Sequence, residues 1–311
     1  MIRSSRNAAE QRRHRDGLEL FMRVFLFPGQ GSQYCGMGKD LFDAVPEFKA
    51  AETEIDRVLG YSAREVCLTG PETRLKDTRF TQPCLFIVNA LYFYNAVRSG
   101  DQPDVVAGHS LGEYNALLAA GAFDLVTGVR LVAKRGELMS GAPGGAMAAV
   151  LRIPIERVQR ILRDEPGLAM VDVANLNSAM QTVIAGSTET IRSAATAFES
   201  EGAKYMVLPV GAAFHSRLMA EVAGMFERFL EPFTFSAMKI PVLSNVTALP
   251  YPRECPGGLI KAFLAQQITS PVQWMGSMNY LRAKNGTTFT EVGPGRVLTR
   301  LCEQIAREAA A

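Results

Sequence analysis

Residues 105–114 read Val-Val-Ala-Gly-His-Ser-Leu-Gly-Glu-Tyr, an apolar run that leads into a Gly-x-Ser-x-Gly pattern and a helical stretch through Ala120. A strand, a sharp turn and a helix in this order form a nucleophile elbow. Gly108 and Gly112 permit the tight turn that lifts the Ser110 hydroxyl out of the backbone, and the first helical amides favour negative charge nearby. The five-residue pattern alone also occurs as a structural turn. Its position between strand and helix favours a nucleophilic serine.

The rest of the chain places this elbow in an α/β fold. From Met22 onward, short apolar strands alternate with longer helical patterns, which predicts a mostly parallel sheet. Residues 22–143 and 209–311 are expected to form this large domain. Residues 144–208 follow the order βαββαβ, which is typical of a ferredoxin-like unit, so we expect a small inserted subdomain and a ligand cleft beside it. Its predicted strands cover 146–151, 169–174, 181–185 and 205–208, and its predicted helices cover 155–163 and 188–201.

The first 21 residues differ from the rest. They carry five arginines and no apolar core segment, which excludes a secretory signal. We interpret them as a disordered tail or as sequence upstream of a true start at Met22. The alternative of an organelle transit peptide is disfavoured by Glu10, Asp16 and Glu19.

Composition excludes several classes of function. The 311 residues are 48% hydrophobic with a net charge of +2, so bulk charge recruits neither nucleic acid nor an anionic membrane. No apolar run approaches the ~20 residues that span a bilayer. The five cysteines, at positions 35, 67, 84, 255 and 302, are odd in number and lack metal-ligand spacing. They predict reduced thiols in a cytoplasmic protein, without disulfides or a metal site.

A serine nucleophile needs a base, normally a histidine, and the chain has three. His14 lies in the tail, and the elbow geometry aims the His109 side chain away from Ser110. His215 remains, in a loop of small residues at 211–216. A lone loop histidine is usually a solvated side chain. Elimination of the other two favours His215 as the base, provided that Ser110 is a nucleophile.

An arginine on an apolar helix stripe is a second candidate. Leu131, Arg135 and Leu138 share one face of a helix predicted over 129–139, so Arg135 faces inward. Such an arginine can extend to the surface or pair with a buried acid. The functional alternative is a bidentate clamp for a substrate carboxylate, which suits guanidinium geometry.

The oxyanion of an acyl-transfer intermediate needs two N–H donors. One is usually the amide after the nucleophile, here Leu111. A glycine-rich turn at 27–33, at the end of the first strand, is of the type that brings amides close to a ligand. A phosphate loop and a plain turn compete with this interpretation. The absence of a Gly-Lys-Ser/Thr ending disfavours nucleotide hydrolysis.

Together these patterns resemble the malonyl-CoA:acyl carrier protein transacylase family, including the discrete acyltransferases of fatty acid and polyketide synthesis. The resemblance runs from about Met22 to Leu301. It is carried by FPGQGSQ at 27–33, GHSLGEY at 108–114, KRG at 134–136, NLNS at 175–178, FHS at 214–216, QITSPVQW at 267–274 and EVGPG at 291–295.

The resemblance implies a hydrolase-like α/β domain with an inserted ferredoxin-like subdomain, and a role for each matching residue. Ser110 would be the acylated nucleophile and His215 its base, oriented by the backbone carbonyl of Gln267. Gln30 and Leu111 would donate the oxyanion amides. The reaction would be ping-pong, with no metal or redox cofactor.

The same resemblance implies the substrates. Arg135 would hold the malonyl carboxylate, and Asn175, with Asn177, would line the cleft. Phe214 leaves little room for an α-methyl branch, which favours malonyl over methylmalonyl. The partners would be malonyl-CoA and the phosphopantetheine arm of an acyl carrier protein, and we expect a monomer that binds neither nucleic acid nor membrane.

Two other functions compete with acyl transfer as interpretations of these motifs. A hydrolase that removes acyl groups from carrier proteins has no obvious use for Arg135. A carrier-protein docking module without chemistry would be expected to lose Ser110, His215 or the Gln30 loop. The basic residues 296 and 300, on the predicted last helix, are interpreted as solvated surface charge rather than as a carrier-protein contact.

Overall fold

The computed structural model describes residues 21–254, 256–284 and 286–310. The predicted tail therefore lies outside the described residues except for Phe21, and His14 and Cys255 lie outside them too. Across the described ranges, no helix is both long and apolar enough to cross a membrane.

Seven strands and a larger number of helices alternate along the described chain. The strands are β1 (Met22–Phe27), β2 (Val105–Gly108), β3 (Ala146–Leu151), β4 (Asp172–Ser178), β5 (Gln181–Gly186), β6 (Lys204–Val207) and β7 (Thr287–Glu291). The α-helices are α2 (Pro46–Leu59), α3 (Ala63–Thr69), α4 (Glu72–Lys76), α5 (Thr78–Arg98), α6 (Gly112–Ala119), α7 (Leu125–Ser140), α8 (Ile155–Asp164), α9 (Thr188–Ser193), α10 (Ala195–Glu199), α11 (Ala220–Leu230), α12 (Gly257–Gln267), α13 (Trp274–Arg282) and α14 (Val297–Glu308).

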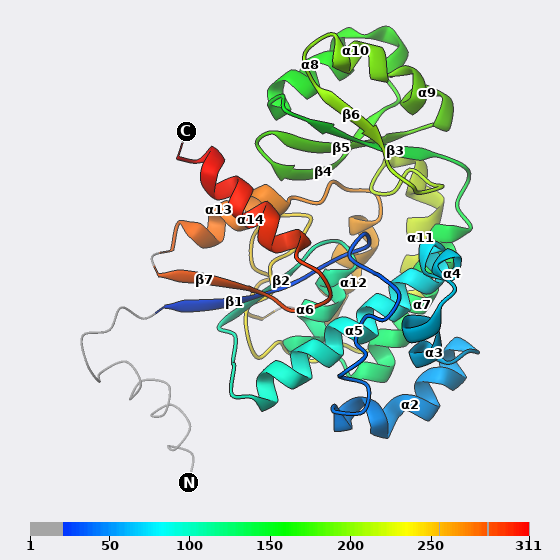
Figure 1. The fold of residues 1–311 in the computed structure, drawn as a ribbon, viewed down its shortest axis with the longest axis vertical. Coiled ribbons are helices and arrows are strands. Elements are labelled where there is room, and N and C mark those ends of the chain that lie inside the picture. The colour runs from blue at the N-terminus through cyan, green and yellow to red at the C-terminus, as the bar shows by residue number, and fades with distance from the viewer. Residues whose placement is uncertain (1–20, 255, 285, 311) are drawn as a thin grey trace.

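The large domain is built on a parallel sheet with the order β2-β1-β7. In the central strand β1, Phe25 and Phe27 pack into the core formed with α5, α6 and α7, whereas Val24 and Leu26 pack into a second core with α13 and α14. Helices therefore cover both faces of the sheet (Figure 1), which is why its central strand is apolar on both sides. The predicted α/β class is confirmed.

The small subdomain has an antiparallel sheet of order β4-β5-β3-β6, formed by a βαββαβ run as predicted. Ala148 and Val150 of β3 pack against α8, α9 and α10, which cover the face of the sheet away from the large domain (Figure 1). Met147 and Ala149 point the other way and join the main core. Because successive side chains of β3 point to opposite faces of the small sheet, one face packs against its own helices and the other packs against the large domain.

Some predicted element bounds were wrong. The strand predicted over 169–174 is β4, which starts later because residues 166–168 form a 3₁₀ turn. It also continues further, since the N–H of Leu176 donates to the carbonyl of Val272 in the large domain at 3.0 Å. The single helix predicted over 188–201 is divided into α9 and α10 at Ala194, and β6 begins and ends one residue early.

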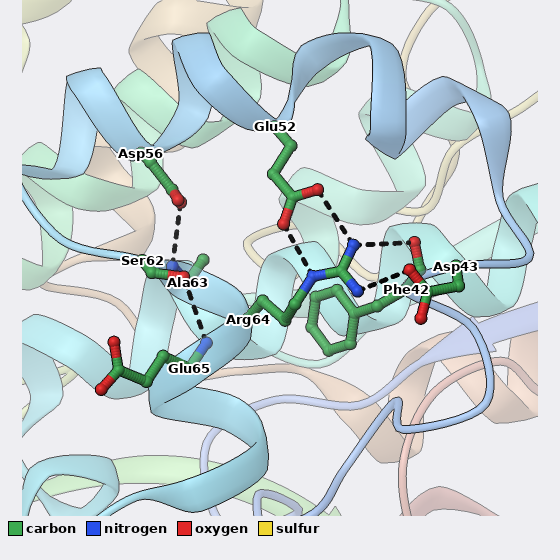
Figure 2. Close-up of polar contacts among 8 residues, drawn as sticks. All are labelled: Phe42, Asp43, Glu52, Asp56, Ser62, Ala63, Arg64 and Glu65. Atoms are coloured by element: carbon green, nitrogen blue, oxygen red, sulfur yellow. Dashed lines mark hydrogen bonds and ion pairs between the residues drawn. The ribbon is translucent and has the colours of Figure 1, made fainter.

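A charged fork fixes the corner between α2 and α3 in the large domain. Arg64 of α3 donates Nε and Nη2 to the carboxylate of Glu52 on α2, at 2.7 and 2.9 Å, and Nη1 to Asp43 at 2.7 Å (Figure 2). Ser62 caps α3 by accepting the N–H of Glu65 at 3.2 Å. This bidentate geometry sets the angle between the two helices on the side of the domain away from the small subdomain.

Candidate active site

The turn between β2 and α6 holds Ser110 in a left-handed backbone conformation, with φ of 51°. Few residues other than glycine adopt this conformation, and it is typical of strained functional turns. A Cβ on Gly108 would overlap the backbone of Gly112, and a Cβ on Gly112 would overlap the carbonyl of Phe27. Both glycines are therefore required for the elbow to fit against β1.

Ser110 and His215 meet although 105 residues separate them. Ser110 Oγ lies 2.8 Å from His215 Nε2, and His215 Nδ1 lies 2.8 Å from the backbone carbonyl of Gln267. A carbonyl oxygen only accepts hydrogen bonds, so Nδ1 carries the proton and Nε2 is left free to accept the serine proton. The arrangement is a dyad with a carbonyl in place of an acid.

The surroundings of His215 favour its neutral form. The side chain is 4% exposed, and burial followed by the nearby Arg135 charge lowers its pKa to about 3. A neutral imidazole is the form that can accept a proton from Ser110. The imidazole is therefore neutral at neutral pH, in the form that a general base requires.

Arg135 lies beside the nucleophile, on a helix that is longer than predicted because Asp124 caps it. Its side chain is 1% exposed, and Nη2 donates to Ser110 Oγ at 3.2 Å and to Gln267 Oε1 at 3.0 Å. The guanidinium lies 5.5 Å from the ring centre of Tyr114. No carboxylate among the described residues is hydrogen-bonded to it, and its Nε is buried without a partner there. The guanidinium thus has unused capacity for an anionic ligand.

The glycine-rich turn after β1 comes against the elbow. A Cβ on Gly29 would overlap the carbonyl of His109, so glycine permits this close approach. The side-chain amide of Gln30 donates to Thr78 Oγ1 at 3.1 Å. Gln30 and Leu111 line the same cavity as Ser110.

Residues of strand β4 in the small subdomain form one side of the site. His109 turns its Nε2 to Asn177 Oδ1, at 2.9 Å, so its ring contacts β4. Asn175 lines the cavity.

Arg296 and Arg300 were interpreted from the sequence as solvated surface charge, and both are exposed.

Ser110 lines an inner chamber, and an outer channel shares several lining residues with that chamber. The inner chamber has a volume of about 110 Å³ and contacts Ser110, Arg135, Phe214 and His215. An outer channel of about 470 Å³ shares Asn175 with the chamber and runs between the glycine-rich turn, the small sheet and α14. The chamber is small and is lined by the Arg135 guanidinium, and the channel leads from the chamber to the surface.

Three site residues were missed by the sequence analysis. Asn245 accepts the N–H of Ser110 and donates to the carbonyl of Gly108, both at 2.6 Å. Glu113 and Tyr251 form a 2.6 Å hydrogen bond below the elbow. A lone acid in the apolar stretch after the elbow was a usable signal for Glu113. Asn245 and Tyr251 left no local signal.

Comparison with known proteins agrees with this geometry. The profile of the family described as "Acyl transferase domain" matches residues 24–311, nearly the whole described chain. The chain belongs to this acyl transferase family. The acyltransferase is 48% identical, over 293 residues, to "Polyketide biosynthesis malonyl CoA-acyl carrier protein transacylase BaeC" of Bacillus velezensis, a match that covers 93% of this chain and 99% of that protein.

Solved structures agree with the fold of this acyltransferase. The malonyl CoA-acyl carrier protein transacylase of Burkholderia pseudomallei superposes with a TM-score of 0.86 at 45% identity, covering 93% of this chain and 99% of that one. A structure described as a type II PKS acyl-carrier protein in complex with its malonyl-transacylase has a TM-score of 0.86 at 34% identity, covering 92% and 93%.

We expect the His215 imidazole of the folded acyltransferase to be neutral at about pH 5, where an ordinary histidine of pKa about 6.5 is mostly protonated. The folded pKa lies below the unfolded one, so unfolding takes up a proton. Stability from this group is complete above about pH 6.5 and declines toward pH 3. An NMR titration of the imidazole, assigned with His215→Gln, checks this. The urea-unfolded chain is the reference, and a folded-state midpoint near its value would contradict the assignment.

Proposed function

We propose that this acyltransferase moves a malonyl group from malonyl-CoA to the phosphopantetheine thiol of an acyl carrier protein through an ester on Ser110. The observation that carries the proposal is the buried Arg135 guanidinium, whose Nη2 lies 3.2 Å from the nucleophilic oxygen. A cation held this close to Ser110 suits an acyl group that ends in a carboxylate. The names of the relatives from Bacillus and Burkholderia support the same reaction.

In the first half-reaction, His215 Nε2 takes the proton of Ser110 as Oγ attacks the thioester carbonyl. The amides of Gln30 and Leu111 are proposed to stabilise the oxyanion. Collapse of the intermediate breaks the C–S bond, and the imidazolium proton goes to the leaving thiolate of coenzyme A. The carrier-protein thiol then gives its proton to His215 as its sulfur attacks the ester carbonyl. The C–O bond to Ser110 breaks, and the imidazolium returns the proton to Ser110 Oγ.

The two spaces fit the two parts of the substrates. The inner chamber would hold the malonyl group, with its carboxylate on Arg135, whose Nε has no partner among the described residues. The outer channel, lined by Asn175 and Asn177, would take the phosphopantetheine arm. All reacting groups come from the substrates and the protein side chains, so the proposed reaction uses no further cofactor.

The biological setting is part of the proposal. The name of the Bacillus velezensis relative includes polyketide biosynthesis, which supports the supply of extender units to a polyketide pathway. Fatty acid synthesis is the alternative pathway. Cys35, Cys67, Cys84 and Cys302 are free thiols, which supports a reducing cytoplasm. A monomer remains the prediction.

Intact-protein mass measurement tests the reaction directly. Brief exposure to malonyl-CoA should add one malonyl group to the chain, and Ser110→Ala should prevent it. The adduct should then disappear as a phosphopantetheinylated carrier protein gains the group. Loss of the adduct to water alone, or equal labelling by acetyl-CoA, would favour the hydrolase alternative.

Phe214 is predicted to exclude an α-methyl branch. Its ring is 7% exposed and forms part of the chamber wall. Phe214→Ala should therefore raise transfer of methylmalonyl relative to malonyl by about 10- to 200-fold, the range for one methylene in an apolar pocket. Competition between the two thioesters, read by mass, measures the ratio. Phe229→Ala, outside the chamber, is the matched control, and an unchanged ratio in Phe214→Ala would contradict the assignment.

A further inference from the structure

Glu113 lies one turn after the nucleophile on α6 and is completely buried. Among the residues that the structure describes, it is the buried carboxylate, as Arg135 is the buried arginine. The two do not touch directly. The side-chain amide of Gln267 lies between them, donating to Glu113 Oε2 at 2.5 Å and accepting from Arg135 at 3.0 Å.

The carboxylate of Glu113 has three donors. Tyr251 Oη donates to Oε1 at 2.6 Å, and the backbone N–H of Asn245 donates to Oε2 at 3.2 Å, beside the Gln267 amide. Burial raises the pKa of Glu113 to about 7, and the three donors oppose that rise. A backbone N–H can only donate, so Oε2, which receives the N–H of Asn245, is an acceptor.

This acceptor sets the direction of the Gln267 amide. A glutamine side chain has one donor end and one acceptor end, Arg135 can only donate to it, and Glu113 Oε2 accepts on its other side. The NH₂ end must therefore face Glu113, which leaves Oε1 facing Arg135. The reverse orientation would point a donor at the guanidinium and leave it without this partner. The same NH₂ group also donates to the carbonyl of Ser110 at 3.1 Å.

A second arm leads from Glu113 to the nucleophile. The carboxylate holds the backbone of Asn245, whose side chain bonds to both ends of the elbow, the Ser110 N–H and the Gly108 carbonyl. These two bonds brace the backbone of Ser110 in its left-handed conformation. The Glu113 backbone N–H donates to the carbonyl of Ser110 at 3.1 Å. The Glu113 carboxylate is hydrogen-bonded neither to Ser110 Oγ nor to the Arg135 guanidinium, but it contacts Asn245 and Gln267, which are hydrogen-bonded to Ser110 and Arg135.

We propose that Glu113 is a positioning residue for acyl transfer: through Gln267 it directs the Arg135 guanidinium, and through Asn245 it braces the Ser110 turn. The first arm rests on the proposed function, because it matters for acyl groups that carry a carboxylate. The second arm affects every acyl group. The two arms can therefore be separated by substrate.

The test compares malonyl and acetyl transfer in matched variants. Glu113→Gln keeps the shape of the side chain but no longer forces the Gln267 amide to face one way. Its malonyl-over-acetyl ratio of kcat/KM should fall about tenfold or more, the loss expected for a buried hydrogen bond to a charged group. Tyr251→Phe removes a donor to Glu113 without freeing that amide and should keep the wild-type ratio. Asn245→Ala should slow both substrates by the same factor.

A second variant makes the test independent of how well Glu113→Gln folds. Gln267→Met removes both ends of the amide and should lower the ratio at least as far. In the double variant, Glu113→Gln should then cause no further fall, because the two residues act in series. An unchanged ratio in Gln267→Met, additive losses in the double variant, or equal losses of malonyl and acetyl transfer in Glu113→Gln would overturn the arm through Gln267. Unchanged acetyl transfer in Glu113→Gln would overturn the arm through Asn245.

Labelling of Ser110 by a fluorophosphonate separates this inference from the proposed function. Malonate should protect Ser110 in the wild type more than acetate does, and Glu113→Gln should lose that difference. If the wild type transfers no malonyl group, the proposed function fails and this assay still tests Glu113. Equal protection by malonate in wild type and Glu113→Gln would overturn the arm through Gln267. No protection in the wild type would contradict Arg135 as the carboxylate clamp and with it the proposed function.

Discussion

Replacing His215 with alanine should lower the rate of Ser110 acylation by about three to six orders of magnitude, because nucleophile and base act as one unit. The structure supports this expectation with a 2.8 Å contact between Ser110 Oγ and His215 Nε2 and a second one from Nδ1 to a carbonyl. Single-turnover transfer from malonyl-CoA, followed by intact mass, is the measurement.

The controls for this experiment lie in the same turn. Ser110→Ala and the double variant should form no malonyl adduct, and they give the background against which the residual rate of His215→Ala is measured. His109→Ala removes a histidine that adjoins the nucleophile but turns toward Asn177, so its loss should be far smaller. A His215→Ala enzyme with activity near that of the wild type would remove His215 from the mechanism.

Replacing Arg135 with alanine should raise the activation free energy of malonyl transfer by about 2–5 kcal/mol, which lowers its rate about 30- to 5,000-fold. The rate of acetyl transfer should not fall. The physical reason is the loss of a charge-assisted pair inside a chamber of about 110 Å³. Little water fits there to replace the guanidinium as the partner of the substrate carboxylate. The guanidinium is the charged group nearest the nucleophile, at 3.2 Å. Initial rates with the two thioesters and one carrier protein give the comparison.

Two further variants sharpen the interpretation. Arg135→Lys keeps the charge but lacks the planar fork, so it should restore malonyl transfer only in part. Arg130→Ala changes an arginine on the same helix that is exposed and paired with Glu54, and it should leave the malonyl-to-acetyl ratio unchanged. Equal losses of malonyl and acetyl transfer in Arg135→Ala would make the arginine structural.

The sequence predicted the parts of the site that have a local pattern. The elbow was visible because strand, glycines and helix are contiguous, and its placement determines where Ser110 stands. The base could be found by elimination because the chain has only three histidines. Arg135 could be predicted to point inward from helical spacing alone, yet that spacing did not distinguish a clamp from a buried ion pair. The structure shows it beside Ser110, with no carboxylate bonded to it among the described residues.

The elements that were misplaced depend on contacts between distant parts of the chain. The strand β4 continues past its predicted end because a loop of the large domain supplies hydrogen bonds to its edge. The same is true of the residues that went unnoticed, since 135 residues separate Asn245 from Ser110. No periodicity or motif spacing encodes a pairing over that distance.

The sequence by itself therefore determined the α/β class, the nucleophile and the histidine that can serve it, because these depend on local backbone preference and on residue counts. Only the tertiary structure decided how they are held: which side-chain amide faces Arg135, which carboxylate accepts from that amide, and which asparagine bonds to the Ser110 turn. Such choices depend on donor and acceptor geometry in a buried space, and that space exists only after the chain has folded.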